Sequence, residues 1–170
     1  MASSVAEAAA TQASMSGNWL GAIGAAVLGA VFAAATSSVG SMPVTRITVL
    51  RDEATGAKRE ALSRYLQNPT RVLSRWLVGR IGCTALTAVL IGNAVRHLAP
   101  HWAVPVAVLG TLATYGLLTE ISTTLARRTA ARSAPLLLRL LRPAEWITLP
   151  LAWPLEAAAR LSGRLMPPPA

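Results

Sequence analysis

The sequence is poor in cysteine and in acidic residues, and both shortages narrow the choice of function. It has one cysteine, Cys83, which excludes a disulfide framework and a thiolate metal site within one chain. The chain has seven acidic residues (Asp and Glu) and 16 basic residues (Lys and Arg), which gives a net charge of +9. In a soluble protein that charge would indicate nucleic-acid binding, but here the arginines flank apolar runs and do not form one patch interleaved with aromatic residues. We therefore expect no nucleic-acid partner.

Charged residues of either sign are scarce as well. They make up 14% of the chain, whereas 53% is hydrophobic, and 170 residues cannot bury so much apolar surface in one aqueous core. Three apolar runs, over residues 18–39, 72–95 and 102–125, are long enough to cross a hydrocarbon core of ~30 Å. The sequence thus predicts an all-α integral membrane protein with three transmembrane helices, cytoplasmic juxtamembrane and belt helices, and membrane lipids as partners.

The segments outside these runs set the expected domain boundaries. Residues 1–16 are rich in Ala and Ser and predict a flexible extracytoplasmic leader, residues 17–165 form the transmembrane domain, and residues 166–170 predict a disordered tail. Prolines interrupt the apolar stretches of the last part, which favours broken or interfacial belt helices over about 133–165. A cleaved signal peptide is the alternative for the first run, although no Lys or Arg precedes it.

The distribution of Lys and Arg indicates the orientation. These residues are absent before Arg46, sparse between the second and third runs, and dense again from Arg127 to Arg142. Because cytoplasmic loops carry the excess of positive charge, we expect the amino terminus outside and the carboxyl terminus in the cytoplasm, in a multi-pass protein of the cell membrane. The basic stretch after Gly40, with apolar residues set among the arginines, is typical of an interfacial helix.

Two ionisable residues lie inside predicted crossings, where an unpaired charge is costly. Arg80 lies about two turns into the second run and Glu120 about two turns before the cytoplasmic end of the third, so the helical rise brings them to a similar depth. We predict that Arg80 and Glu120 form an ion pair, which would fix the helix register or replace a bound cation. The alternative is that Arg80 alone extends to the inner interface.

Hydroxyl groups gather where the first run ends, just before an expected helix break at Pro43, and others flank the acidic residue of the third run. Oxygen ligands of this kind suit hard cations such as Mg²⁺, and the sequence indicates no other cofactor. Hydroxyls bonded to their own helix backbone are the alternative. The candidate metal ligands are Ser37, Ser38, Ser41 and Glu120.

His97 and His101 have the i, i+4 spacing of zinc ligands on a helix. Pro100 argues against a continuous helix there, and the sequence offers no third ligand, so two interfacial histidines are the alternative. No pairing of a nucleophile with a base can be named, and we expect the protein not to be an enzyme.

Three segments share their order with a known family. They are FAAATSSVGSMPVTRI from Phe32 to Ile47, NPTRVLSRWLVGR from Asn68 to Arg80, and LTEISTTLARR from Leu118 to Arg128. On these segments the chain resembles the transmembrane domain of the cyclin M and CorB/CorC magnesium transporter family. The resemblance implies a helical membrane domain, divalent-cation transport, and assembly as a homodimer or as a heterodimer with a full-length paralogue.

The departures from the family pattern fall at positions that handle the ion. The family's serine and glutamate in the first segment are Ala35 and Thr36 here, its asparagine in the second is Arg80, and its acidic residue in the third is kept as Glu120. The resemblance therefore implies a degenerate site, without the cytoplasmic nucleotide-binding domains of many family members. We expect a divergent magnesium or divalent-cation transporter-like protein with an impaired or partner-dependent ion site; the alternative is a non-transporting membrane scaffold or assembly subunit.

Overall fold

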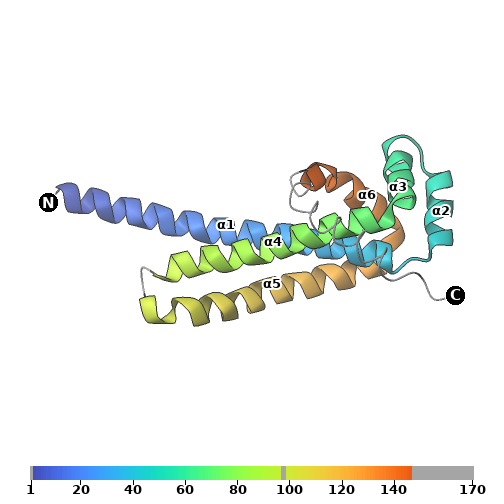
Figure 1. Ribbon diagram of the computed structural model, residues 1–170. Helices are drawn as coiled ribbons and strands as arrows, with labels where there is room; N and C mark the ends of the chain where they lie inside the picture. Colours follow the sequence, from blue (N-terminus) through green and yellow to red (C-terminus); the bar gives the residue numbers. More distant parts are fainter. Residues whose placement is uncertain (1, 97–98, 147–170) are drawn as a thin grey trace, which may run out of the picture. The chain divides into compact units, whose positions relative to one another are not determined.

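The computed structural model describes residues 2–96 and 99–146, and within these ranges it contains helices and no strand (Figure 1). This confirms the all-α fold class. The α-helices are α1 (Ala2–Gly40), α2 (Val44–Glu53), α3 (Ala57–Gln67), α4 (Pro69–Arg96), α5 (Ala103–Arg128) and α6 (Ala130–Leu140), with a 3₁₀ turn η1 (Pro100–Trp102) before α5. A short helical segment, 142–146, follows α6.

Three helices are long and apolar enough to cross a membrane. They cover Met15–Gly40, Pro69–Arg96 and Pro100–Arg128, so the three predicted crossings are confirmed and each extends beyond its apolar run. The extension follows from helix geometry, because a helix continues into polar residues until a breaker stops it. Prolines mark two of the starts, and proline is favoured in the first turn of a helix because its missing N–H has no partner there in any case.

The structure differs from the sequence-based prediction at both ends of the domain. Residues predicted to be a flexible leader are helical from Ala2, since they are rich in alanine, the strongest helix former. The predicted interfacial helix is two helices, α2 and α3, separated at Gly56, whose φ of 59° suits glycine. The predicted belt begins earlier, at Ala130. Residues 147–165 of the predicted belt and the predicted tail 166–170 lie outside the described residues.

The chain divides into two compact units. The first comprises residues 1–31 and 81–122, and there α1, α4 and α5 pack closely. A Cβ atom on Gly29 of α1 would lie 2.5 Å from Cε2 of Tyr115 and 3.1 Å from Cβ of Cys83, so the three helices meet at this glycine. The sequence singles out Gly29 and other small residues of α1 as points of close approach, and the packing at Gly29 fits that interpretation.

The second unit comprises residues 32–80 and 123–170. Here α3 packs against both α2 and α6. Phe32 of α1 lies against α4, since a Cβ atom on Gly79 would be 2.6 Å from Cζ of the phenyl ring. The largest fully buried side chains of the second unit are Trp76, Phe32, Ile47, Leu62, Leu138, Leu141, Val39 and Ser38.

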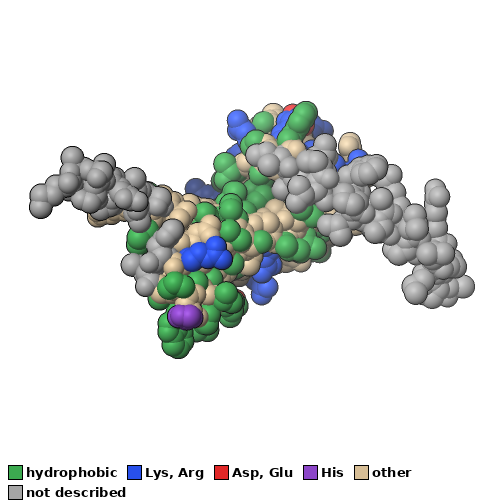
Figure 2. All heavy atoms as spheres, turned by 60° about the vertical axis from the view of Figure 1, so that its left-hand side comes forward, with side chains coloured by type: hydrophobic (Ala, Val, Ile, Leu, Met, Phe, Trp, Pro, Cys, Tyr) green, Lys and Arg blue, Asp and Glu red, His purple; other side chains and the backbone are tan. Residues whose placement is uncertain are grey.

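Large apolar side chains also lie on the outside of the crossing helices. Leu20 of α1 is 72% exposed, and Val104 and Leu112 of α5 are 73% and 66% exposed. Figure 2 shows such hydrophobic side chains exposed on one face of the molecule. In water this surface would be unfavourable by ~25 cal/mol per Å², whereas lipid chains solvate it. The exposed apolar surface is therefore that of a multi-pass membrane protein.

Candidate functional site

The serine cluster predicted as part of a cation site lies at the end of α1. The Ser38 hydroxyl donates to the carbonyl of Ala35 at 2.9 Å, and the Ser41 hydroxyl donates to the carbonyl of Ser38 at 3.0 Å. Thr36 likewise donates to Phe32 at 2.9 Å. These hydroxyls therefore use their protons within their own helix, and their oxygens keep lone pairs that can still accept. Just beyond them Pro43, with ψ of 149°, separates α1 from α2 as predicted.

The other predicted site residues are divided between the two units. Arg80 of α4, which is half-buried, belongs to the second unit together with Ser37, Ser38 and Ser41. Glu120 of α5, which is exposed in the single chain, belongs to the first unit. The Arg80–Glu120 ion pair and the four-residue metal site thus stay predictions.

Two buried hydroxyls lie near Glu120 in the first unit. The Tyr115 hydroxyl and the Thr119 hydroxyl are both buried and have no hydrogen-bond partner among the described residues. The two residues are four apart, so they lie on one face of α5. A buried hydroxyl without a partner is costly.

One member of the predicted histidine pair lies outside the described residues. His101 is exposed in η1, whereas His97 lies outside the described residues. The break at Pro100 occurs as predicted, because η1 begins there. Among the described residues, His, Cys, Asp and Glu form no group of three that could hold a metal ion.

The structure reveals a buried charge network that joins three distant parts of the chain. Arg64 of α3 donates from Nη1 to Oε2 of Glu145 at 2.9 Å, and from Nη2 to Oε1 at 3.3 Å. The Trp76 indole of α4 donates from Nε1 to the same Oε1 at 3.1 Å. Arg64 Nη2 also donates to the carbonyl of Leu138 at 3.1 Å. The network therefore ties α3, α4, α6 and segment 142–146 together.

Glu145 is among the most buried charged groups described, with 3% of its side chain exposed. Burial raises the pKa of its carboxyl above the usual range for glutamate. Arg64, the Trp76 hydrogen bond, Arg75 and Arg142 each act in the opposite direction and lower that pKa, but burial dominates. Both carboxylate oxygens accept hydrogen bonds, which is the condition under which such burial is tolerated.

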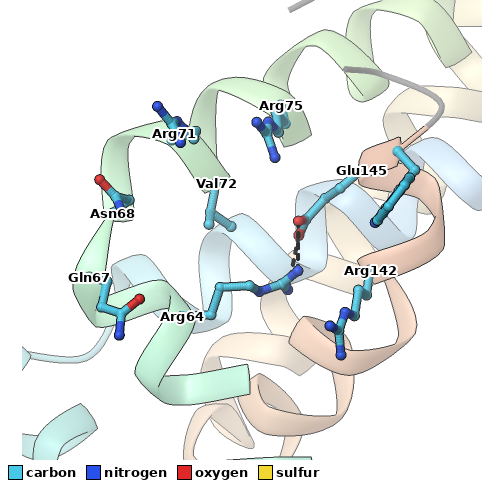
Figure 3. Close-up of a pocket in the computed structure, with 9 residues that line it drawn as sticks. Arg64, Gln67, Asn68, Arg71, Val72, Arg75, Arg142 and Glu145 are labelled. Carbon is cyan, nitrogen blue, oxygen red and sulfur yellow. Dashed lines mark hydrogen bonds and ion pairs between the residues drawn. The ribbon is translucent and has the colours of Figure 1, made fainter. Parts of the chain in front are cut away.

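A cavity of about 350 Å³ opens beside this network (Figure 3). Figure 3 shows Arg64 and Glu145 pointing toward each other, with Arg71 and Arg75 on α4 and Arg142 on the segment after α6. Arg142 also pairs with Glu60 through Nη1 and Oε1 at 3.2 Å, with both side chains more than half exposed. The full lining is Arg64, Gln67, Asn68, Arg71, Val72, Arg75, Arg142, Glu145 and Trp146.

Sequence reasoning missed this network because its members are far apart in the chain. Arg64 and Glu145 are 81 positions apart, and Trp76 and Glu145 are 69 positions apart. One signal was present: Glu145 is the single acidic residue between Glu120 and Glu156, in a stretch rich in Leu and Arg. A lone carboxylate in such a stretch requires a partner wherever it is buried.

Taken together, the three apolar crossings and the basic helices beside them define an α-helical multi-pass membrane domain. Residues 20–168 match the family model described as the cyclin M transmembrane N-terminal domain, and the chain belongs to this family. The family is associated with divalent-cation transport. Comparisons with curated proteins and with solved structures give no match.

Proposed function

We propose that this protein is a divergent magnesium or divalent-cation transporter-like membrane protein of the cyclin M type, whose ion site is impaired or is completed by a partner. The observation that carries the proposal is one retained residue and one substituted residue at positions of the family pattern. The chain keeps an acidic residue, Glu120, in its third crossing, and it places Arg80 where the resembling family has asparagine.

The chemistry of these two residues explains the impairment. A carboxylate in a crossing attracts a cation, whereas a guanidinium is always protonated and repels one. If Arg80 faces Glu120, its charge occupies the place of the cation and neutralises the carboxylate. The hydroxyl oxygens of Ser37, Ser38 and Ser41 remain as acceptors for a cation that displaces the arginine.

Orientation and assembly form part of the proposal. The distribution of Lys and Arg supports an amino terminus outside the cell membrane and a carboxyl terminus in the cytoplasm. The apolar surfaces exposed on α1, α4 and α5 offer room for a second copy, or for a full-length paralogue that supplies the missing ligands. The proposed role is non-enzymatic.

The decisive experiment is Mg²⁺ flux into proteoliposomes containing the purified full chain. Arg80→Asn restores the residue type of the family, and Arg96→Asn makes the same change at the last residue of α4, which is exposed. If Arg80 blocks the site, Arg80→Asn gains flux over the wild type and Arg96→Asn does not. Adding Glu120→Gln to Arg80→Asn should then abolish the gain.

The second candidate function is a membrane scaffold or assembly subunit, which the loss of family ligand types favours. Absence of Mg²⁺ flux in both the wild type and Arg80→Asn, with both proteins folded, would contradict transport and support the scaffold role. Flux in the wild type that is lost in Glu120→Gln would show a divergent but working site.

A further inference from the structure

The cavity beside Glu145 is rich in arginine. Four arginines and one glutamate line it. Arg142 also pairs with Glu60, which lies outside this lining. Arginine is the residue that matches phosphate oxygens best, because its planar fork donates two parallel hydrogen bonds. The charge and the residue type both indicate an anionic ligand.

The backbone beside the cavity favours the same sign of charge. α4 begins at Pro69, and the lining residues Asn68, Arg71 and Val72 belong to its first turn or directly precede it. The unpaired N–H groups and the dipole of a helix make its amino end positive. α4 has 28 residues, so this end carries the full helix dipole. The cavity therefore combines a helix amino end with four arginines.

The position of the cavity indicates that its anionic ligand comes from the membrane. The second membrane crossing starts at Pro69, so the cavity lies at the amino-terminal end of that crossing. Trp146 lines the cavity and is 76% exposed, and on neighbouring α6 the apolar side chains of Leu136 and Leu140 are 54% and 64% exposed. An exposed indole beside exposed leucines is typical of the headgroup level of a bilayer. A ligand held here would have its polar part among arginines and an apolar part beside Trp146.

We infer that this cavity binds the phosphate group of an anionic phospholipid. Its volume of about 350 Å³ accommodates a headgroup. Glu145 is the one lining group that opposes an anion, but its side chain is 3% exposed and both oxygens accept hydrogen bonds from Arg64 or Trp76. Glu145 acts as a positioning residue, because it holds the Arg64 guanidinium at the wall of the cavity.

The test measures binding to the purified full chain in neutral detergent. The probes are short-chain phosphatidic acid, short-chain phosphatidylcholine and inorganic phosphate, with binding followed by the shift in thermal unfolding and by titration calorimetry. The variant is Arg71→Gln with Arg75→Gln. The matched control, Lys58→Gln with Arg59→Gln, removes the same charge from two exposed positions of α3 that do not line the cavity.

We expect phosphatidic acid to bind the wild type and the Lys58/Arg59 control with similar affinity, and the Arg71/Arg75 variant at least about tenfold more weakly, the order expected for losing one charge-assisted hydrogen bond. Phosphatidylcholine, which is zwitterionic, should bind about equally weakly to all three proteins. If the double variant does not fold, Arg71→Gln alone, at an exposed position, gives the same comparison.

Three results would overturn the inference. Equal loss of affinity in the control would mean that net charge alone attracts the lipid. Binding of inorganic phosphate as tight as that of phosphatidic acid would assign the cavity to a soluble phosphate. Absence of any phosphatidic acid binding to the folded wild type would remove the site. None of these measurements depends on ion transport.

Discussion

Trp76 donates its indole N–H to Glu145 at 3.1 Å, and this bond joins the start of the second membrane crossing to the segment that follows α6. Trp76 is completely buried and Glu145 almost so. Neither residue could be buried at low cost without the other, because an indole N–H and a carboxylate both require partners when they leave water.

Replacing Trp76 with phenylalanine removes the donor and keeps most of the ring. We expect the free energy of unfolding to fall by about 1–2 kcal/mol, because one oxygen of a buried carboxylate loses a hydrogen bond. Thermal unfolding in detergent, followed with a thiol-reactive dye on buried Cys83, measures the change. Trp102→Phe is the control, since Trp102 is 65% exposed; an equal loss in both variants would contradict the prediction.

The stability of the protein should depend on the titration of Glu145. Because burial raises the pKa of this carboxyl in the folded state, the folded protein binds the proton more tightly than the unfolded chain. The contribution of this proton to stability is complete below the ordinary glutamate pKa of about 4.3 and is lost as the pH rises through the raised folded pKa. In unfolding curves over a pH series, the wild type should lose stability relative to Glu145→Gln across that window, and a constant difference would contradict the prediction.

Gly79 leaves room for Phe32, which is 1% exposed. In Gly79→Ala the new methyl group would meet Cζ of the ring at 2.6 Å and Cε2 at 2.8 Å, so we expect a loss of about 1–3 kcal/mol from overpacking. Gly82→Ala in the same helix has nothing within 4 Å and should be neutral or more stable by up to about 1 kcal/mol. Adding Phe32→Leu should recover part of the Gly79→Ala loss, and failure to do so would assign the loss to another contact.

Gly29 permits the contact of three helices in the first unit. Its substitution by alanine would place a methyl group 2.5 Å from the Tyr115 ring and 3.1 Å from Cys83 Cβ. We expect a loss of about 1–3 kcal/mol, whereas Gly24→Ala, which has open space on the same helix, should cause none. Dye labelling of Cys83 at constant temperature should also become faster in Gly29→Ala alone, and equal rates in the two variants would show that α1 does not pack tightly there.

The sequence predicts the membrane crossings well because hydropathy is a local property. The apolar run that includes Val104 and Leu117 identifies a crossing without any information on which helices pack against it. The same reasoning located the break at Pro43, because proline restricts its own backbone. It placed one interfacial helix where α2 and α3 form two, since Gly56 lies in a polar stretch where hydropathy does not mark a turn.

Less of the candidate site could be predicted from the sequence. Arg80 and Glu120 stand out because each is an ionisable residue in an apolar run. Arg64 and Glu145 do not, since each lies among other polar or basic residues and their meeting depends on how α3 packs against α6. A long-range ion pair is a property of the tertiary fold, and local composition does not report it.

The order in which the chain is synthesised gives the Glu145 network a further meaning. Arg64 and Trp76 leave the ribosome before Glu145, by 81 and 69 residues. Until Glu145 is synthesised, the Arg64 guanidinium and the Trp76 indole lack the carboxylate that accepts their hydrogen bonds in the folded protein. The buried network is therefore completed by a carboxylate that is synthesised after both of its side-chain partners.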